Sequence, residues 1–252
     1  MLKAIKNLLA FLTILPVHMD MNCLVDSARF MFIFPLVGAL LGLLAGVFGW
    51  AISFFLPTLV VGALTLSVLL LLSGLHHTDG LLDFGDALMC HGTPERKIEV
   101  MHDQFTGAGA IGLGLMTYVV SAFAFAGLGA AVIIQSLIVV ELCAKLAMVV
   151  SCWAGRSVHK GMNSPFMEVM HGKYGTLRLV AALFLSLLVA VPLLWFAGWF
   201  VGLVVVSISV LASGVIVTIA HRHFGGVTGD VFGATNELVR MVAVVVLLAM
   251  FQ

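Results

Sequence analysis

Apolar residues fill long blocks of this chain, and polar residues gather in the links between them. A helix needs about 20 apolar residues to cross the hydrocarbon core of a bilayer, whereas a barrel strand needs only about 10. Blocks of the observed length therefore predict spanning helices. The predicted spans are residues 31–53, 58–75, 108–127, 131–154, 177–197, 199–220 and 234–251. This pattern predicts an all-α, polytopic membrane helical bundle with about seven transmembrane helices.

The links between the predicted spans alternate between short and long. The short links, around Pro57, Leu128 and Gly198, carry no charge, whereas the N-terminal segment and residues 76–106, 155–176 and 221–233 are long and polar. Nearly all basic residues lie in or beside the long links: Lys3, Lys6, Arg29, Arg96, Lys97, Arg156, Lys160, Lys173, Arg178 and Arg222. By the positive-inside rule we expect a multi-pass protein of the cell (inner) membrane with its active site facing the cytoplasm.

Composition narrows the class of protein further. Of 252 residues, 62% are hydrophobic and only 10% are charged, against about 25% charged in soluble domains. The lipid bilayer is thus the expected surrounding, and residues 1–252 read as a single integral-membrane catalytic domain. A net charge of zero excludes nucleic-acid binding through a basic surface. The sequence leaves the choice between a monomer and a homo-oligomer open.

Two segments have a structural interpretation. The first sixteen residues combine a basic start with the apolar run Leu8 to Leu15, which predicts an amphipathic N-terminal helix in the membrane interface. Gly38, Gly42 and Gly46 recur at every fourth position of the first span. This spacing predicts a smooth helix face against which a neighbouring helix packs closely.

The main candidate for chemistry is a group of three carboxylates directly after the second predicted span. Asp79, Asp83 and Asp86 are spaced i, i+4 and i+7, which places them on one face of a helix. Three like charges at a membrane boundary need a counterion, and carboxylate oxygens suit a hard divalent cation such as Mg²⁺. An isolated aspartate is usually only solvated, but a shared face beside the membrane favours a functional site.

A second acidic segment follows. Thr93 and Pro94 predict the N-cap and first residue of a short cytoplasmic helix near residues 94–105. Glu99 and Asp103 lie at i, i+4 in that segment, and Asp103 directly precedes the glycines that lead into the third span.

Several polar residues elsewhere have two interpretations. The turn Gly225–Asp230 precedes the last predicted span, where backbone N–H groups can hold an anion, although glycine turns are often plain loops. Glu141 and Lys145 are either a buried i, i+4 ion pair, or Lys145 contacts a substrate phosphate. Glu237 and Arg240 are expected to pair or to face a cavity.

Two further residues complete the candidates. His77, beside the acid group, is a candidate for binding a phosphate or moving a proton. Asn163 lies in a polar turn to which composition assigns no role.

These blocks together resemble cobalamin synthase, the adenosylcobinamide-GDP ribazoletransferase family. The most specific match is His77-x-Asp79-Gly80-Leu81-x-Asp83-x-x-Asp86, which is similar to the H-x-D-G-L-x-D-x-x-D signature of that family. The chain also carries a similar N-terminal F-x-T-x-x-P segment and first-span F-P-L-x-G pattern, as well as the C-terminal G-G-x-T-G-D block. It departs from the family at Gln104-Phe105, where Ser-Arg is usual.

The resemblance implies a Mg²⁺-dependent transferase. Its substrates would be adenosylcobinamide-GDP and alpha-ribazole, or alpha-ribazole 5′-phosphate, with release of GMP. It implies that Asp79, Asp83, Asp86 and Asp103 hold one or two Mg²⁺ ions and that Asp86 or Asp103 is the catalytic base. The substrate-binding candidates are His77, Arg96, Lys145, Asn163, Thr228, Gly229, Asp230 and Glu237.

Two other functions remain as alternatives. A CDP-alcohol phosphotransferase-like membrane enzyme also places aspartates on membrane helices, but its D-G-x-x-A-R spacing requires Ala-Arg where this chain has Asp83-Phe84. An ion-coupled transporter would also bury acids in its helices. It should place them near the middle of the membrane, whereas here the main acidic group lies to one side.

Overall fold

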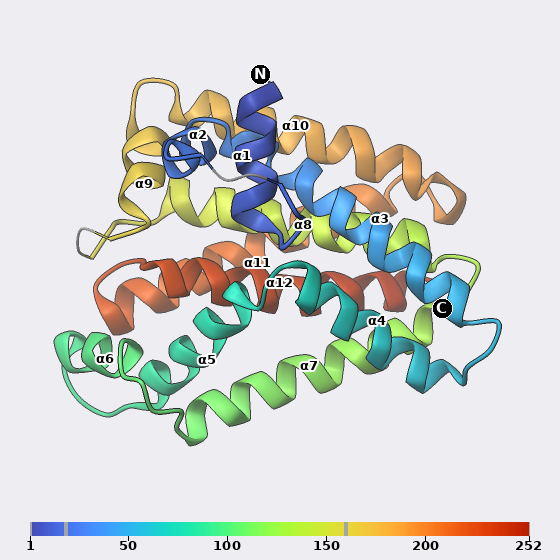
Figure 1. Cartoon of the computed structure of the whole chain (residues 1–252), viewed down its shortest axis with the longest axis horizontal. Coiled ribbons are helices and arrows are strands. Elements are labelled where there is room, and N and C mark those ends of the chain that lie inside the picture. Colours follow the sequence, from blue (N-terminus) through green and yellow to red (C-terminus); the bar gives the residue numbers. More distant parts are fainter. Residues whose placement is uncertain (1, 18–19, 159–160, 252) are drawn as a thin grey trace.

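The computed structural model describes residues 2–17, 20–158 and 161–251, and throughout this part of the chain the regular elements are helices (Figure 1). They are α1 (Leu2–Leu12), α2 (Cys23–Arg29), η1 (Met31–Ile33), α3 (Phe34–Ile52), α4 (Thr58–Leu72), α5 (His76–Met89), α6 (Pro94–Met101), α7 (Ala108–Leu128), α8 (Ile133–Ala154), α9 (Ser164–His171), α10 (Gly175–Leu193), η2 (Trp195–Ala197), α11 (Val201–Phe224) and α12 (Gly229–Met250). The all-α prediction is confirmed. Lys160, one of the basic residues of the long links, lies outside the described residues.

The number of helices that can cross a membrane agrees with the hydropathy pattern. Six helical segments in the described part of the chain are long and apolar enough: residues 31–52, α7, α8, α10, α11 and α12. Helix α4 has only 15 residues and meets α5 at an angle of 99°. Counting this bent pair as one span gives up to seven crossings.

The last two long helices extend beyond the predicted apolar runs. Helix α11 continues through the polar residues His221 to His223 and stops at Gly225, whose φ of +79° a glycine adopts without strain. Helix α12 begins at Gly229 rather than near residue 234, because the Thr228 side chain caps it. Residues 225–228 therefore form a tight helix-to-helix connection, and Asp230 already belongs to the first turn of α12.

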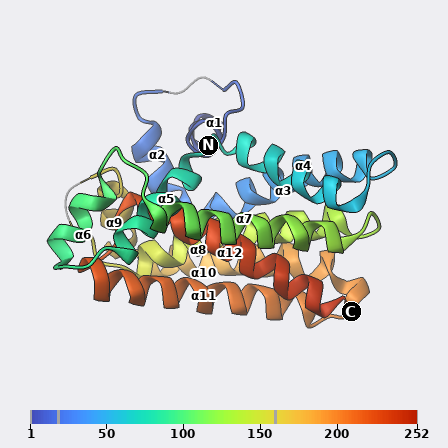
Figure 2. The same ribbon diagram turned by 90° about the horizontal axis from the view of Figure 1, so that it is seen from below.

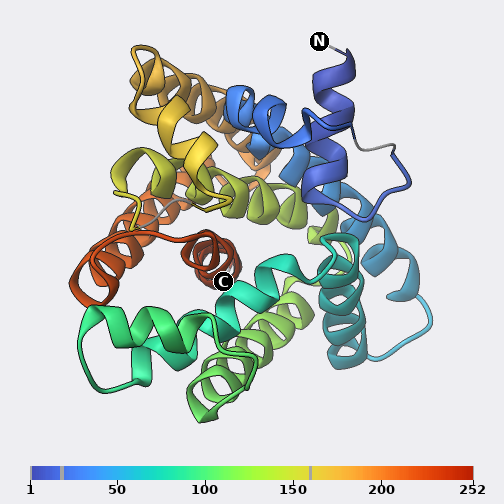
Figure 3. The same cartoon turned by 60° about the vertical axis from the view of Figure 1, so that its left-hand side comes forward.

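Helix α8 is the centre of the bundle. Every residue from Val139 to Cys152 is buried, and α3, α10, α11 and α12 pack around it. A helix that is apolar on all sides belongs in such a position. Figure 3 shows α12 in the interior as well, between α5 and α8.

The glycine spacing of the first span produces the predicted close approach to α8. A Cβ atom on Gly38 or Gly42 would overlap the carbonyl oxygen of Glu141 or Leu137, respectively. A Cβ on Gly46 would lie 2.9 Å from the Cα atom of Ile134. The two backbones therefore touch along one stripe, and only glycine fits there.

Helix α1 lies across the long helices instead of along them. Figures 1 and 2 show it crosswise and nearly end-on, respectively. Its inner face buries Ala4, Leu8 and Leu12, while Lys3 and Lys6 are exposed. This confirms the predicted amphipathic helix.

The short polar helix is shorter than predicted. Thr93 caps α6 by accepting a hydrogen bond from the Arg96 N–H at 3.5 Å, but the helix ends at Met101 instead of continuing to residue 105. The Asp103 carboxylate accepts from the backbone N–H of Phe105 at 3.3 Å. Such a local turn competes with helix continuation and accounts for the early end.

Gly42→Ala should destabilise the protein by about 1–3 kcal/mol, because the added methyl group overlaps backbone that cannot move aside. The matched control is Gly112→Ala in α7, where an added Cβ meets nothing within 4 Å. We expect the control to be neutral or slightly stabilising. Thermal unfolding of the detergent-solubilised variants measures the difference, and equal midpoints for the two would contradict the proposed helix contact.

Candidate functional site

The direction of α5, which carries the acid group, is set by the corner that precedes it. Gly74 and Leu75 both have positive φ angles, of 70° and 60°. For Leu75 this left-handed conformation costs about 1–2 kcal/mol, because its Cβ approaches the following carbonyl oxygen. The corner turns the chain away from α4, and α5 then packs between α7 and α12 (Figure 1).

Helices α5 and α12 touch backbone to backbone through two glycines. A Cβ on Gly80 would lie 2.7 Å from the carbonyl oxygen of Asp230. A Cβ on Gly233 would lie 3.2 Å from the Cα atom of His77. We call this contact the α5–α12 crossing. It brings into contact two segments that lie about 150 residues apart in the sequence. One carries the His77–Asp86 motif, and the other carries the glycine-rich block that ends at Asp230.

The α5–α12 crossing gathers three carboxylates. The half-buried Asp83 lies within electrostatic reach of Asp79 and of Asp230, in the first turn of α12. Asp230 accepts a hydrogen bond from the Thr228 hydroxyl at 3.2 Å and lies 3.7 Å from Nε2 of His102. The side chains of Asp79 and Asp83 make no hydrogen bond or ion pair with any residue that the structure describes. They are therefore the carboxylates of the group with unused oxygen ligands.

Asp86, the third residue of the predicted stripe, has a structural contact. Its carboxylate accepts hydrogen bonds from the backbone N–H groups of Gly107, at 2.5 Å, and Ala110, at 2.8 Å. It thereby caps the N-terminus of α7, where a negative charge also complements the helix dipole. Gly85 and Gly109 allow this approach, because a Cβ on Gly109 would lie 2.6 Å from the Gly85 oxygen.

Asp103 makes its hydrogen bond within its own turn, with the backbone N–H of Phe105. It is exposed beyond the end of α6 and lies within electrostatic reach of Arg96. Arg96 in turn is exposed and forms an ion pair with Glu99 at 2.8 Å. The roles predicted for Asp103 and Arg96 remain predictions that this geometry does not support.

The carboxylates suit Mg²⁺ better than a metal that needs a full set of protein ligands. No three His, Cys, Asp or Glu side chains surround a common point in the described part of the chain. Mg²⁺, however, is usually held by one or two carboxylates together with substrate phosphates and water. The unpaired oxygens of Asp79 and Asp83 meet that smaller requirement.

A cavity of about 660 Å³ adjoins the α5–α12 crossing and is bounded by α1, α2, α5, α9 and α12. Much of its polar lining comes from α5 and the start of α12, namely His76, His77, Asp79 and Asp230, and Asp20 and Asn163 add to it from the loops before α2 and α9. The rest of the lining is mainly phenylalanine and methionine. The volume lies within the ~300–1,000 Å³ typical of small-molecule sites.

Four of the predicted substrate-binding residues line this cavity: His77, Asn163, Gly229 and Asp230. Nδ1 of His77 is buried and has no hydrogen-bond partner among the described residues. The Asn163 amide donates to Ser157 Oγ and to the Val227 carbonyl, both at 3.1 Å, which ties the loop before α9 to the loop before α12. Thr228 lies just outside the lining and caps α12 through the Val231 N–H at 3.3 Å.

An ion pair between two residues near the N-terminus of the chain lies at the edge of the cavity. Asp20, which lines the cavity, forms an ion pair with Lys3 at 2.5 Å. The hydrogen bond and the charge of Lys3 hold the pKa of Asp20 below its ordinary value. Asp20 is therefore a neutralised carboxylate that fastens the loop after α1.

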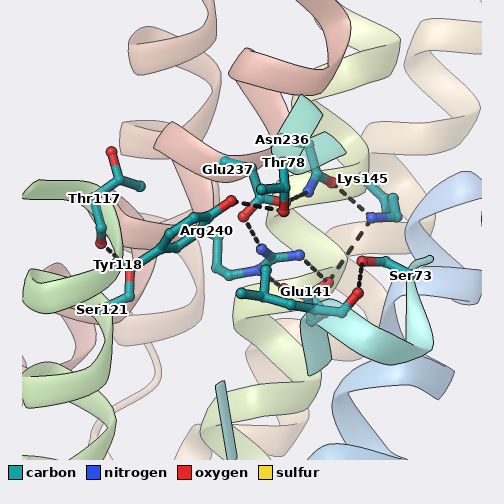
Figure 4. A network of polar contacts seen from close by, with 11 residues as sticks. Ser73, Thr78, Thr117, Tyr118, Ser121, Glu141, Lys145, Asn236, Glu237 and Arg240 are labelled. Carbon is teal, nitrogen blue, oxygen red and sulfur yellow. Dashed lines mark hydrogen bonds and ion pairs between the residues drawn. The ribbon is translucent and has the colours of Figure 1, made fainter. Parts of the chain in front are cut away.

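The remaining predicted residues belong to a buried network inside the bundle (Figure 4). The guanidinium of Arg240 forms ion pairs with both Glu141 and Glu237. Nζ of Lys145 donates to Asn236 at 2.7 Å and lies 3.9 Å from Glu141. Two acids and two bases thus neutralise one another at positions that water does not reach. The paired interpretation of Glu141 with Lys145 and of Glu237 with Arg240 is confirmed.

Lys97 is a residue whose position the sequence did not predict. It is buried, and its Nζ donates to the Leu88 carbonyl at 3.2 Å and contacts Nδ1 of His223 at the same distance. A cation at the C-terminal end of α5 satisfies free carbonyls and complements the helix dipole. The i, i+4 spacing of Lys97 and Met101 on α6, both buried, was the available signal.

Replacing Arg240 by leucine should destabilise the protein by about 3–5 kcal/mol, because two buried carboxylates lose their cation. Arg222→Leu, at an exposed position near the end of α11, is the matched control and should change stability by less than about 0.5 kcal/mol. Adding Glu237→Gln to Arg240→Leu should recover part of the loss, since it removes one uncompensated charge. Denaturant unfolding measures all three variants, and a mild effect of Arg240→Leu alone would argue against the network.

Comparisons with known proteins identify relatives of this chain. The family model for cobalamin-5-phosphate synthase matches residues 4–248. A protein of Methanocella arvoryzae named adenosylcobinamide-GDP ribazoletransferase is 34% identical, and the match covers 96% of this chain and 94% of the relative. Relatives of the same name are 33% identical in Thermococcus kodakarensis, over 96% of each chain, and 28% identical in Methanococcoides burtonii, over 98% of this chain and 92% of the relative.

No solved structure matches the chain. The match to the family model nevertheless includes α5, the α5–α12 crossing and the buried network, and extends over almost the entire sequence. The chain therefore belongs to the cobalamin-5-phosphate synthase family.

Proposed function

We propose that this protein is an adenosylcobinamide-GDP ribazoletransferase. It would transfer the phospho-cobinamide group of adenosylcobinamide-GDP to alpha-ribazole, or to alpha-ribazole 5′-phosphate, and release GMP. Family membership and the printed names of relatives that are matched over nearly their full length support this activity over the two alternatives. The single observation that carries the proposal is the α5–α12 crossing, which brings Asp79 and Asp83 of α5 together with Asp230 of α12 beside a cavity that Asp79 and Asp230 line.

The reaction is an attack of a ribose hydroxyl on phosphorus. The hydroxyl oxygen forms a bond to the phosphorus that carries the cobinamide, and the bond from that phosphorus to the bridging oxygen of GMP breaks. The hydroxyl proton passes to a carboxylate of the protein, and GMP leaves with the bridging oxygen. Positioning and charge neutralisation supply most of the catalysis in reactions of this kind.

The residues divide between two tasks. Asp79 and Asp83 would hold Mg²⁺, because their oxygens have no other partner in the described structure. Bound Mg²⁺ would neutralise the diphosphate and polarise the phosphorus under attack. Asp230 lines the cavity from α12 and is our candidate for the proton acceptor, in place of Asp86, which caps α7, and Asp103, which does not line the cavity.

The distribution of charged residues between the two ends of the bundle supports a site that faces the cytoplasm. The short links at one end, residues 53–57, 129–132 and 194–200, contain no charged side chain, whereas the basic residues of the described chain outside the buried network lie towards the other end. The positive-inside rule then assigns the end with α6 and α9 to the cytoplasm. We propose this orientation in the cell (inner) membrane, and it would give water-soluble substrates direct access.

The test is GMP release by the purified protein in detergent with adenosylcobinamide-GDP, alpha-ribazole and Mg²⁺. Asp83→Asn should lower the rate by about a hundredfold or more, since it removes a ligand of the Mg²⁺ whose charge would stabilise the transferred phosphoryl group. Chelation with EDTA should stop the native reaction, and added Mg²⁺ should restore it.

Glu99→Gln is the matched control, because Glu99 is an exposed carboxylate on α6 that pairs with Arg96. It should leave the rate within about twofold of the native value. A native rate for Asp83→Asn would remove the metal assignment. Ion flux through proteoliposomes without GMP release would instead favour a transporter.

A further inference from the structure

Three phenylalanine rings from distant segments meet in the wall of the cavity. Phe11 of α1, Phe34 of α3 and Phe166 of α9 all line it. The ring centroids of Phe11 and Phe166 are 5.4 Å apart, those of Phe34 and Phe166 are 6.0 Å apart, and those of Phe11 and Phe34 are 6.3 Å apart. We call these residues the aromatic wall. Phe34 and Phe166 are almost completely buried and thus fixed in place, whereas Phe11 is half-buried.

Methionine side chains complete the apolar part of the lining. Met31 and Met148 are buried beside the aromatic wall, and Met21 and Met162 are exposed. Methionine sulfur and methyl groups pack well against the faces and edges of aromatic rings. This part of the cavity therefore suits a flat, apolar ring with few groups that need hydrogen bonds.

The polar side chains close to the apolar part already have partners. Asp20 is paired with Lys3, and the Asn163 amide N–H groups are directed at Ser157 and Val227. A guanine ring has donors and acceptors along its edge, and leaving them unpaired in an apolar site costs binding free energy. The guanine base of the donor substrate is therefore a poor match for this wall.

The size of the cavity also argues against the corrinoid part of the donor substrate as its ligand. At about 660 Å³ it has room for a nucleoside, whereas a corrin macrocycle with its amide and adenosyl groups is larger than the cavity. The base of ribazole is a benzimidazole with two methyl groups, so it is flat, aromatic and almost free of hydrogen-bonding edges. It matches both the size and the chemistry of the apolar lining.

We propose that the cavity binds the acceptor nucleoside, with its benzimidazole base against the aromatic wall and its ribose towards the α5–α12 crossing. This inference rests on the proposed function, since it assigns one of the two substrates to the cavity. The same enclosure contains the aromatic wall and Asp230, so a nucleoside bound in this way directs its ribose hydroxyls to the carboxylates. The bulky corrinoid then approaches from outside the cavity, and only its diphosphate reaches the site.

Two variants change the cavity in different ways. Phe11→Ala removes the half-buried ring of the aromatic wall, and Met148→Phe fills part of the space. Phe30→Ala is the matched control, because Phe30 is also half-buried, stacks on Phe32 at 6.2 Å and does not line the cavity. Thermal midpoints of the detergent-solubilised full chains establish that each variant is folded. Phe11→Ala alone suffices if Met148→Phe does not fold.

The primary measurement is the Kd of alpha-ribazole by isothermal titration, without the donor substrate. We expect Phe11→Ala to raise this Kd by about tenfold, as the loss of one aromatic contact predicts, and Met148→Phe to raise it by a similar factor because the larger side chain occupies part of the binding space. Phe30→Ala should leave it unchanged. The KM for adenosylcobinamide-GDP should stay within about twofold in all three variants, and guanosine should not displace alpha-ribazole.

The outcomes separate this inference from the proposed function. If the native protein releases GMP but both cavity variants bind alpha-ribazole normally, the inference is wrong and the proposed function stands. A raised KM for adenosylcobinamide-GDP with unchanged alpha-ribazole binding would also overturn the inference and assign the cavity to the donor. If the native protein shows no GMP release although it binds alpha-ribazole, the proposed function fails independently of where that ligand binds.

Discussion

The position of α5 depends on the close approach of backbones at glycines on both of its sides. Gly80 and Gly233 bring it against α12, and Gly85 and Gly109 bring it against α7. An added Cβ would overlap backbone at Gly80, Gly85 and Gly109 and would be tightly packed at Gly233, so the helix has little freedom to slide or rotate. This constraint holds the carboxylates of α5 in a fixed register with the first turn of α12. A site that must position phosphate oxygens needs such rigidity, because small displacements of catalytic groups lower the rate strongly.

The buried network supports the same arrangement from within the bundle. Arg240 and Glu237 belong to α12, and Glu141 and Lys145 belong to α8. Ion pairs between buried charges need specific geometry, since any shift leaves a charge uncompensated in an apolar interior. The network therefore fixes the rotation and height of α12 relative to α8. Because α12 also carries Asp230, the central helix α8 controls the site indirectly, without lining most of it.

Hydropathy and spacing predicted the helices better than they predicted the roles of single residues. The spans, the amphipathic α1, the glycine contact of α3 with α8 and the Glu141–Lys145 pair followed from the periods of a helix and the need to neutralise buried charge. The capping role of Asp86 did not, because Gly107 follows it only after 21 positions and nothing local marks the contact. Lys97 was counted as a surface base, since its burial depends on α5 and α11. The ring contacts of Phe11, Phe34 and Phe166 join segments whose proximity no local pattern indicates.

The shortness of α4 has a consequence for where the reaction takes place. Fifteen helical residues rise by only about 22 Å, which is less than the ~30 Å thickness of the hydrocarbon core. Local thinning is one way in which a bilayer accommodates so short a hydrophobic segment, and it lowers the membrane surface there. The bend at Gly74 and Leu75 would then lie at headgroup depth, in a water-filled depression next to lipid phosphates. A large hydrophilic donor substrate could then reach the acceptor substrate in this depression without entering the hydrocarbon core of the bilayer.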